Sequence, residues 1–338
     1  MKYNILGKTG LRVSRLGFGG IPIQRVPAAE AAATIRRCLE LGVNFIDTAR
    51  AYTDSEEKIG QALAGVPRDS YALATKSMAV DGETMTRDIE ISLRNLRTDY
   101  IDLYQCHNIR RDQDEERLLG PGGGLEALRR AREAGKIRHI GVTGHQVERL
   151  IRLLRTGWFE TVQVPYNFNE TKPEEELLPL AVKENIGVIT MKPLGGGALP
   201  ASLALRFFLD KPVGAIIPGM ENPALAEENA RCLTEDGPLT PADQADVDRV
   251  KAELGKWYCR RCDYCQPCPQ GIDIAGVFLF HGYFGRYNMK DWARGRYAGL
   301  KVKADACIAC GACVGRCPYQ LPIPALLRKA AADLAGAI

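Results

Sequence analysis

The chain has 338 residues, of which 46% are hydrophobic and 25% are charged, and its formal net charge at pH 7 is +4. These values are typical of a globular protein with a large core and more than one domain. Lysines and arginines are scattered among acids and no apolar run reaches the ~18 residues of a membrane span, so we expect no nucleic-acid partner and no membrane segment. The first twenty residues contain no apolar stretch with a small-residue cleavage site, which predicts a cytoplasmic protein.

Short β-rich runs alternate with amphipathic helical stretches through the first two thirds of the chain. The predicted strands are 15–19, 44–48, 71–76, 100–107, 137–143, 161–166, 187–193 and 214–218, and the predicted helices are 28–41, 55–64, 84–96, 125–134, 147–155, 173–184, 199–209 and 223–232. Strand–helix alternation at this spacing predicts parallel strands with crossover helices. Eight pairs fit a (β/α)8 TIM barrel.

The main rival is a dinucleotide-binding sheet, which needs the pattern G-x-G-x-x-G after its first strand. Here that strand ends in Gly17-Phe18-Gly19-Gly20-Ile21-Pro22, which breaks the pattern at the third glycine. The strand count and the failed pattern both favour the barrel. The preceding segment 2–14 is predicted to form a hairpin that plugs the barrel floor.

Eight of the eleven cysteines form two quartets near the C-terminus, and a proline follows each quartet. The quartets are Cys259, Cys262, Cys265 and Cys268, then Cys307, Cys310, Cys313 and Cys317. Three cysteines at C-x2-C-x2-C spacing bind three corners of an iron–sulfur cube, and the fourth, before proline, ligates the other cube in two-cluster ferredoxins. This pattern predicts two [4Fe–4S] clusters, with Cys317 on the first cube and Cys268 on the second.

Zinc is the alternative for these cysteines, because C-x2-C pairs also form zinc sites. Zinc has no use for a third cysteine at the same spacing or for the repeated Cys-Pro, and a disulfide framework would need an oxidising compartment. The first quartet is one residue short between Cys265 and Cys268, which leaves its ligand pairing open. Cys38, Cys106 and Cys232 lie elsewhere and are expected to be small buried hydrophobic residues.

Three parts of the chain follow from these patterns. The barrel is predicted over 1–235, a linker helix within 236–258 (helix 241–256), and a mainly helical ferredoxin-like domain that binds two clusters over 259–338. Seven aromatic residues between the quartets are expected to form the core of this last domain. A terminal helix is predicted over 322–334.

Four polar residues occur where predicted barrel strands end, which is where TIM-barrel active sites lie. Asp47 ends the second strand, Tyr52 follows in the loop, Lys76 ends the third strand and His107 ends the fourth. A charged residue buried in a barrel mouth is costly unless it is paired, and Asp47 with Lys76 supplies the pairing.

Together with Gly-Val-Asn-Phe-Ile-Asp-Thr-Ala at 42–49, these four residues resemble the catalytic positions of the aldo-keto reductase family. The resemblance covers residues 1–235 and implies reduction of an aldehyde, ketone or sugar by a nicotinamide cofactor. Tyr52 would donate the proton, and a nearby Lys76 cation would lower its pKa from about 10. Asp47 would hold Lys76, and His107 would orient the carbonyl oxygen. The quartets resemble the subgroup of this family with a C-terminal ferredoxin-like domain.

The resemblance also implies cofactor contacts near the ends of later strands. These residues are Thr143, Gln163, Asn167, Lys192, Gly195, Gly196, Glu228 and Asn229. The family's NADP binders carry a lysine and an arginine after the eighth strand, but this chain has Ile217-Pro218-Gly219-Met220 there and Leu225 at the arginine position. The implied cofactor is therefore NADP or NAD.

The role of the clusters stays open at this stage. They would relay electrons from a ferredoxin-like partner, or they would be structural. An alternative function is that of an iron–sulfur electron-transfer protein whose barrel is only a scaffold. The charged residues of 110–116 are expected to form a solvated loop.

Overall fold

The computed structural model describes residues 1–255 and 257–336. The chain divides into two compact units, Met1–Leu239 and Thr240–Ile338, which are treated separately below. The predicted linker helix ends at Lys256 and the predicted last domain at Ile338, and both of these ends lie outside the described residues. The described part of that helix, α10 (Pro241–Leu254), belongs to the second unit.

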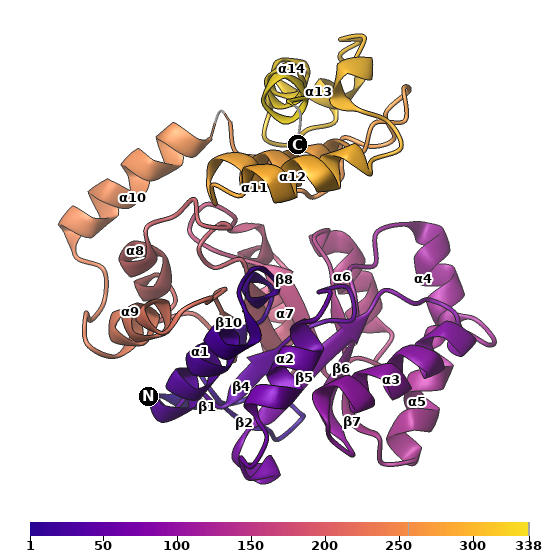
Figure 1. The fold of residues 1–338 in the computed structure, drawn as a ribbon, viewed down its shortest axis with the longest axis vertical. Helices are drawn as coiled ribbons and strands as arrows, with labels where there is room; N and C mark the ends of the chain where they lie inside the picture. Colours follow the sequence, from indigo (N-terminus) through magenta and orange to yellow (C-terminus); the bar gives the residue numbers. More distant parts are fainter. Residues whose placement is uncertain (256, 337–338) are drawn as a thin grey trace. The chain divides into compact units, whose positions relative to one another are not determined.

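The first unit is a closed barrel of eight parallel strands (Figure 1). The strands are β3 (Phe18–Gly19), β4 (Phe45–Asp47), β5 (Ala72–Ser77), β6 (Ile101–Cys106), β7 (Ile137–Thr143), β8 (Thr161–Pro165), β9 (Gly187–Met191) and β10 (Ala215–Ile217). Each strand pairs with the next along the chain. Parallel bridges from Leu16 to Ile216 and from Gly19 to Gly219 join the first strand to the last, so the predicted (β/α)8 barrel is confirmed.

Helices follow the strands and cover the barrel (Figure 1). They are α1 (Ala28–Glu40), α2 (Ser55–Ala62), α3 (Gly82–Leu96), α4 (Asp112–Leu119), α5 (Gly124–Glu133), α6 (Val147–Arg155), α7 (Leu177–Lys183), α8 (Ala201–Arg206) and α9 (Pro223–Thr234), with short 3-10 turns at Pro22–Arg25, Arg68–Ser70 and Lys172–Glu174. The helix predicted over 173–184 is therefore shorter than expected. The Asn222 side chain starts α9 by accepting a hydrogen bond from the backbone N–H of Leu225, and Pro223 occupies the first turn.

The barrel interior has an apolar lower layer. Its buried side chains are Leu6, Val13, Phe45, Ala72, Ala74, Leu103, Ile189, Ala215 and Ile217. Leu6 lies between the antiparallel strands β1 (Tyr3–Ile5) and β2 (Arg12–Ser14) and is completely buried. A Cβ atom added to Gly187 would lie 2.7 Å from Leu6 Cγ, and one on Gly214 would lie 2.6 Å from Leu6 Cδ1. The hairpin thus closes the end of the barrel where β9 and β10 begin, as predicted.

The second unit is mainly helical. It contains α10, α11 (Ile274–Gly285), α12 (Lys290–Ala298), the 3-10 turn Ala304–Ala306, α13 (Ala312–Gly315) and α14 (Ile323–Leu334). Helix α11 packs against both α12 and α14 (Figure 1). The aromatic residues between the quartets contribute to this packing, because the Trp292 ring lies 4.5 Å from the Tyr283 ring and 6.4 Å from the Phe280 ring between centroids. They therefore form a core, as predicted.

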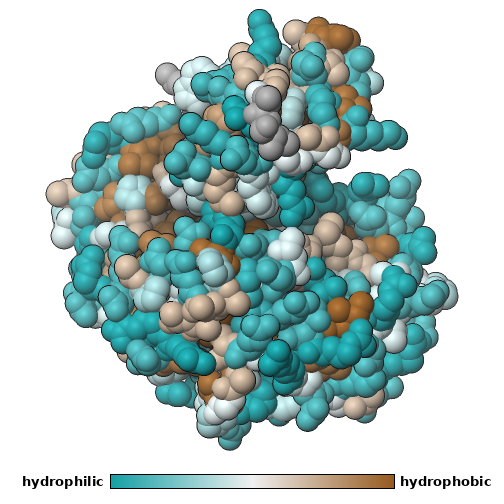
Figure 2. Space-filling view, in the orientation of Figure 1, coloured by the Kyte–Doolittle hydropathy of each residue, from teal (hydrophilic) through white to brown (hydrophobic). Residues whose placement is uncertain are grey.

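The surface of the barrel unit is mostly hydrophilic, with scattered hydrophobic patches on the face in Figure 2. Exposed large hydrophobic side chains occur singly along that unit, among them Ile5, Met78, Trp158 and Val182. Over the described part of the chain, no helix is both long enough and apolar enough to cross a membrane.

Candidate functional site

A polar layer lies directly above the apolar layer of the barrel interior. Side chains two residues apart on a strand face the same side, so Lys76 follows Ala74 into the interior and Gln105 follows Leu103. Asp47 ends β4 and His107 directly follows β6. The ends of neighbouring strands therefore bring an acid, an amine, an amide and an imidazole to one edge of the barrel.

Lys76 and Asp47 form an ion pair inside this layer. Lys76 Nζ lies 2.5 Å from Asp47 Oδ2 and donates a second hydrogen bond to the carbonyl oxygen of Thr48 at 2.7 Å. Burial raises the pKa of Asp47 and lowers the pKa of Lys76, and each charge opposes the shift that burial causes in the other. The attraction between the two charges offsets the loss of hydration that each of them suffers inside the barrel.

Tyr52 and His107 lie beside this pair. The Tyr52 ring centroid lies 5.1 Å from Lys76 Nζ, and the Tyr52 and His107 rings meet edge to face at 5.8 Å with an interplanar angle of 87°. Burial, together with the charges of Lys76 and Lys192, lowers the pKa of His107 well below its ordinary value, so the imidazole is neutral at pH 7. Its Nδ1 atom is buried and has no hydrogen-bond partner among the described residues. All four predicted catalytic side chains therefore lie together.

Two glutamines complete the layer. Gln105 Nε2 lies 3.3 Å from Asp47 Oδ1 and 3.0 Å from Gln163 Oε1, so an amide chain runs from β6 to β8 beneath the ion pair. Gln163 was expected to contact the cofactor, whereas Gln105 was not predicted to have a role. The sequence nevertheless indicated that Gln105 faces the site, because a residue two positions before His107 faces the same side of the strand.

The residues predicted to bind the cofactor lie near the ends of β7 to β9, but several are already engaged. Thr143 Oγ1 accepts a hydrogen bond from the backbone N–H of Asn108 at 2.8 Å. Asn167 Nδ2 donates to the carbonyl oxygen of Lys192 at 3.1 Å. The Lys192 ammonium contacts Nε2 of His145, a residue that was not predicted to contribute. Thr143 and Asn167 therefore shape the loops of this rim.

The other residues predicted to bind the cofactor lie in the segment after β9 and in the middle of α9. Gly195, Gly196 and Gly197 have φ values of 55°, 64° and 78°, a left-handed run that favours glycine. On α9, Glu228 is exposed and Asn229 is 1% exposed. Asn229 Nδ2 is buried without a partner among the described residues, which is a donor that a bound molecule could satisfy.

An unpredicted carboxylate lies between β10 and α9. Glu221 Oε2 lies 2.8 Å from a guanidinium nitrogen of Arg25, and the Glu221 side chain is 34% exposed. Glu221 follows the segment Ile217-Pro218-Gly219-Met220, which lacks any cation. Where the resemblance places a lysine in the family's NADP binders, this chain therefore has no cation, and an acid paired with Arg25 follows the segment.

In the second unit, the cysteine quartets lie close to each other in a crossed arrangement. The pKa values of Cys259, Cys262 and Cys265 are raised mainly by burial and further by the charge of Cys317. The pKa of Cys313 is raised by burial and by the charges of Cys307, Cys268 and Cys310. The Arg316 guanidinium also donates a hydrogen bond to the carbonyl oxygen of Pro267 at 2.7 Å, which ties the two runs together.

These contacts group three cysteines of each run with the fourth of the other. Over residues 1–255 and 257–336, no three histidine, cysteine or acidic side chains lie close enough to hold a single metal ion. None of the eleven cysteines forms a disulfide within the described structure, and Cys38, Cys106 and Cys232 are buried in the first unit, as expected.

Residues 15–202 match the family described as Aldo/keto reductase family. The chain belongs to the aldo/keto reductase family. It is 32% identical to the L-galactose dehydrogenase of Arabidopsis thaliana over 301 residues, covering 74% of this chain and 93% of that protein. It is 28% identical to the NADH-specific methylglyoxal reductase of Escherichia coli, covering 60% of this chain and 70% of that protein.

The barrel also resembles a solved aldo-keto reductase of Bacillus halodurans in its holo form. The TM-score is 0.64 at 25% identity, over 74% of this chain and 96% of that structure. Residues 258–321 match a family described as 4Fe-4S dicluster domain, which favours iron–sulfur over the zinc alternative. This aldo/keto reductase is therefore an oxidoreductase with a C-terminal 4Fe-4S domain.

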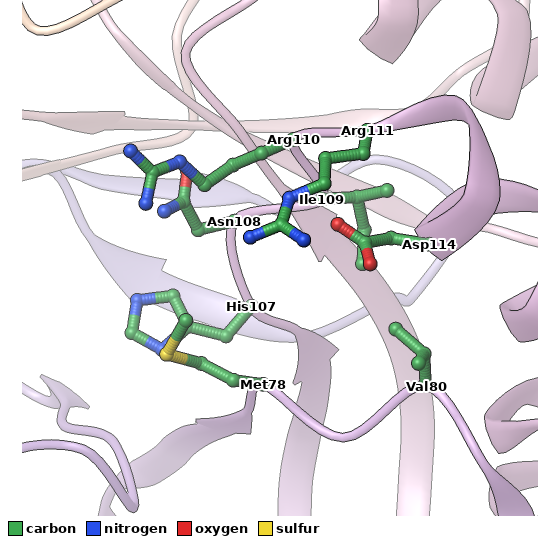
Figure 3. Close-up of a pocket in the computed structure, with 8 residues that line it drawn as sticks. All are labelled: Met78, Val80, His107, Asn108, Ile109, Arg110, Arg111 and Asp114. Carbon is green, nitrogen blue, oxygen red and sulfur yellow. The ribbon is translucent and has the colours of Figure 1, made fainter. Parts of the chain in front are cut away.

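A pocket of about 180 Å³ adjoins His107 in the aldo/keto reductase barrel (Figure 3). It is lined by Met78, Val80, residues 107–111 and Asp114. The segment from Arg110 to Glu116 was expected to be a solvated loop, but it continues into helix α4. Arg110 and Arg111 lie in a loop as expected, but the expectation of a loop was wrong from Asp112 on, where α4 begins. Acids of α4 pair with arginines of α6: Arg149 lies 2.6 Å from Glu115 and 2.9 Å from Asp112. These pairs hold the helix against the barrel.

Proposed function

We propose that this aldo/keto reductase uses NAD(P)H to reduce a carbonyl group of an aldehyde, ketone or sugar to an alcohol, with Tyr52 as proton donor. One observation carries the proposal: the Lys76 ammonium pairs with Asp47 and lies 5.1 Å from the Tyr52 ring. A phenol is a weak acid at neutral pH, and a fixed cation beside it favours its anion. The barrel thus has an acid that can protonate a developing alkoxide.

Each residue of this group has a separate task. A bound reduced nicotinamide would supply a hydride to the carbonyl carbon. Tyr52 gives its hydroxyl proton to the carbonyl oxygen, and Lys76 stabilises the phenolate that remains. Asp47, held by Gln105, keeps the Lys76 ammonium in place.

His107 orients the substrate. A neutral imidazole can donate one N–H to the carbonyl oxygen without introducing a second buried cation next to Lys76. The low pKa of His107 supports this role. Its ring meets Tyr52 edge to face, so both residues can reach the same oxygen atom.

The residues fit a nicotinamide dinucleotide along β7 to β10. Thr143, Gln163 and Asn167 would surround the nicotinamide carboxamide. Lys192 would add positive charge near the pyrophosphate, which could approach the backbone closely at Gly195 and Gly196. Glu228 and Asn229 would contact the adenine. The buried, unpartnered Asn229 Nδ2 is the observation that supports a ligand at that end.

We propose NADH as the preferred cofactor. The carboxylate of Glu221 would repel the 2′-phosphate of NADPH and could accept a hydrogen bond from the ribose hydroxyl of NADH. The absence of a cation from Ile217 to Met220 removes the usual phosphate clamp. A relative with the printed name NADH-specific methylglyoxal reductase is consistent with this preference.

The crossed cysteines support two [4Fe–4S] clusters. Cys259, Cys262 and Cys265 with Cys317 would bind one cube, and Cys307, Cys310 and Cys313 with Cys268 would bind the other. The clusters would relay single electrons from a ferredoxin-like partner or stabilise the C-terminal unit. The clusters require reduced thiols, which supports cytoplasmic residence.

A second function is favoured by one feature of the C-terminal unit. Cys310 is exposed, and Ile308, two residues before it, is 64% exposed, so one cluster would lie near the surface. An iron–sulfur electron-transfer protein with an inert barrel would also have this feature.

The Tyr52→Phe variant distinguishes the two functions. The full chain is purified without oxygen, and reduction of aldehydes, ketones and sugars is measured with NADH and NADPH. Carbonyl reduction should fall by about 10²- to 10⁴-fold in kcat, the usual contribution of a general acid. Tyr3→Phe, which removes a hydroxyl bonded to Gly42 in the hairpin region, is the matched control. Equal rates in Tyr52→Phe and the native protein would leave only the electron-transfer function.

A further inference from the structure

We propose that the carbonyl substrate carries a carboxylate or phosphate group, which Arg111 binds in the pocket beside His107 (Figure 3). This inference rests on the proposed function and names the class of substrate that the same site selects. It concerns only residues of the barrel unit.

The pocket lies on the substrate side of His107. Its lining follows β5 and β6, whereas the residues proposed to contact the cofactor follow β7 to β10. Strand β6 lies between β5 and β7 in the barrel. His107, which follows β6, therefore lies between the pocket residues and the residues proposed to contact the cofactor. A substrate with its carbonyl oxygen at His107 and Tyr52 would extend its remaining atoms into this pocket.

Arg111 is the charge available for an acidic group. Figure 3 shows its guanidinium directed into the space between His107 and Asp114. The Arg111 guanidinium takes part in none of the ion pairs among the described residues; the pairs of this region are made by Arg149 and Arg152. The nearby acids Asp112 and Glu115 are engaged by arginines of α6, so they are not its partners. A guanidinium is a planar fork that matches carboxylate and phosphate oxygens.

The remaining surroundings set the size and charge of the ligand. Met78, Val80 and Ile109 give the pocket apolar walls, and its volume of about 180 Å³ is the space of about six water molecules, which suits a chain of a few carbons. Arg110 adds positive charge, with its guanidinium directed over Asn108 in Figure 3. The carboxylate of Asp114 faces the same pocket and opposes an acidic ligand, so it limits binding.

Matched substrate pairs test the inference with the full, anaerobically purified chain. Succinic semialdehyde is compared with butanal, and glyceraldehyde 3-phosphate with glyceraldehyde, using kcat/KM. The native protein should prefer the acidic member of at least one pair. A preference within the first pair would indicate a carboxylate, and a preference within the second pair would indicate a phosphate. Arg111→Gln should reduce this preference about ten- to hundredfold, the effect of losing a charge-assisted hydrogen bond. Asp114→Asn should increase it, because a like charge is removed.

Arg117→Gln is the control, because Arg117 is an arginine on α4 with a side chain that is 67% exposed and lies outside the pocket lining. It should leave both preferences unchanged. The inference is overturned if the protein reduces neutral and acidic carbonyls alike, or if Arg111→Gln and Arg117→Gln have the same effect. A native protein that reduces no carbonyl would instead overturn the proposed function itself.

Discussion

The Lys76 ammonium lies 2.5 Å from a carboxylate oxygen of Asp47, and the two side chains are only 0% and 3% exposed. Strand pairing explains this contact, because Asp47 is opposite Ala74 in the β4–β5 ladder and Lys76 is two residues further along the same face. Burying this ion pair costs free energy, and removing only one of its charges costs more. Replacing one partner should therefore destabilise the barrel more than replacing both.

Lys76→Met should lower the free energy of unfolding of the barrel by about 3–5 kcal/mol, because Asp47 would remain as an uncompensated buried charge. The double variant Asp47→Asn with Lys76→Met removes both charges and should recover much of this loss. Thermal melting followed by far-ultraviolet circular dichroism measures the difference. Neither variant should reduce carbonyls. Equal melting temperatures for the single and double variants would contradict the interpretation of the pair as mutual compensation.

His107→Phe should lower kcat/KM by about 10²- to 10³-fold, the cost of removing one donor to a developing oxyanion. The pKa of His107 lies well below 6.5, so the native imidazole stays neutral as the pH falls from 8 to 6.5. The variant should therefore show the same shape of pH profile over that range. Profiles of kcat/KM for a neutral aldehyde test this expectation. An acid limb near pH 6.5 that disappears in His107→Phe would show that His107 titrates there.

Much of the fold was predictable because local patterns decide it. Strand β7 and helix α6 have their predicted bounds, since a buried strand and a helix with one apolar face are both readable from residue spacing. Helix α4 was not predicted, because its charges resemble those of a loop until Arg149 and Arg152 of α6 are placed against them. Such pairing between distant segments is not encoded in local periodicity.

The site shows the same division between local and long-range information. The catalytic group was predictable because strand ends meet at one edge of a barrel. The engagement of Asn167 with Lys192 and the pairing of Glu221 with Arg25 join segments separated along the chain. Arg111 was assigned to a solvated loop because acids follow it in the sequence, and only the structure shows that Asp112 and Glu115 pair with α6 instead.

Cofactor preference should depend on Glu221. The native protein should use NADH with a higher kcat/KM than NADPH. Glu221→Gln should raise kcat/KM for NADPH about fivefold, since two like charges about 4 Å apart in bulk water repel by about 1 kcal/mol. The substitution also removes the negative charge that pairs with Arg25. The ratio of kcat/KM for the two cofactors, measured at low ionic strength, gives the result.

Glu126→Gln is a suitable comparison for Glu221→Gln, because Glu126 is an exposed acid of α5 that pairs with Arg130. It carries the same charge change at a site away from the proposed cofactor contacts. A similar shift in both variants would indicate a general effect of net charge and would remove the specific role of Glu221.

The crossed arrangement of the quartets predicts which pairs of cysteine substitutions act on the same cluster. Cys262→Ser, Cys310→Ser and Cys317→Ser should each remove about half of the iron, since every cube needs four ligands. The combination of Cys262→Ser with Cys317→Ser should lose no more than either alone, because both residues are expected on one cube. Cys310→Ser with Cys317→Ser should lose both clusters. Iron and sulfide per chain, measured after anaerobic purification, distinguish these outcomes.

Cys232→Ser serves as the reference, because Cys232 is buried in the barrel unit and should leave the iron content unchanged. If each quartet instead bound its own cube, the result would be reversed. Cys310→Ser with Cys317→Ser would then retain one cluster, and Cys262→Ser with Cys317→Ser would lose both. The crossed arrangement is indicated by proximity between the two runs: the charge of Cys317 raises the pKa values of Cys259, Cys262 and Cys265, and that of Cys268 raises the pKa of Cys313. The iron content of the double variants therefore shows which cube Cys317 binds, which the spacing within either quartet alone does not determine.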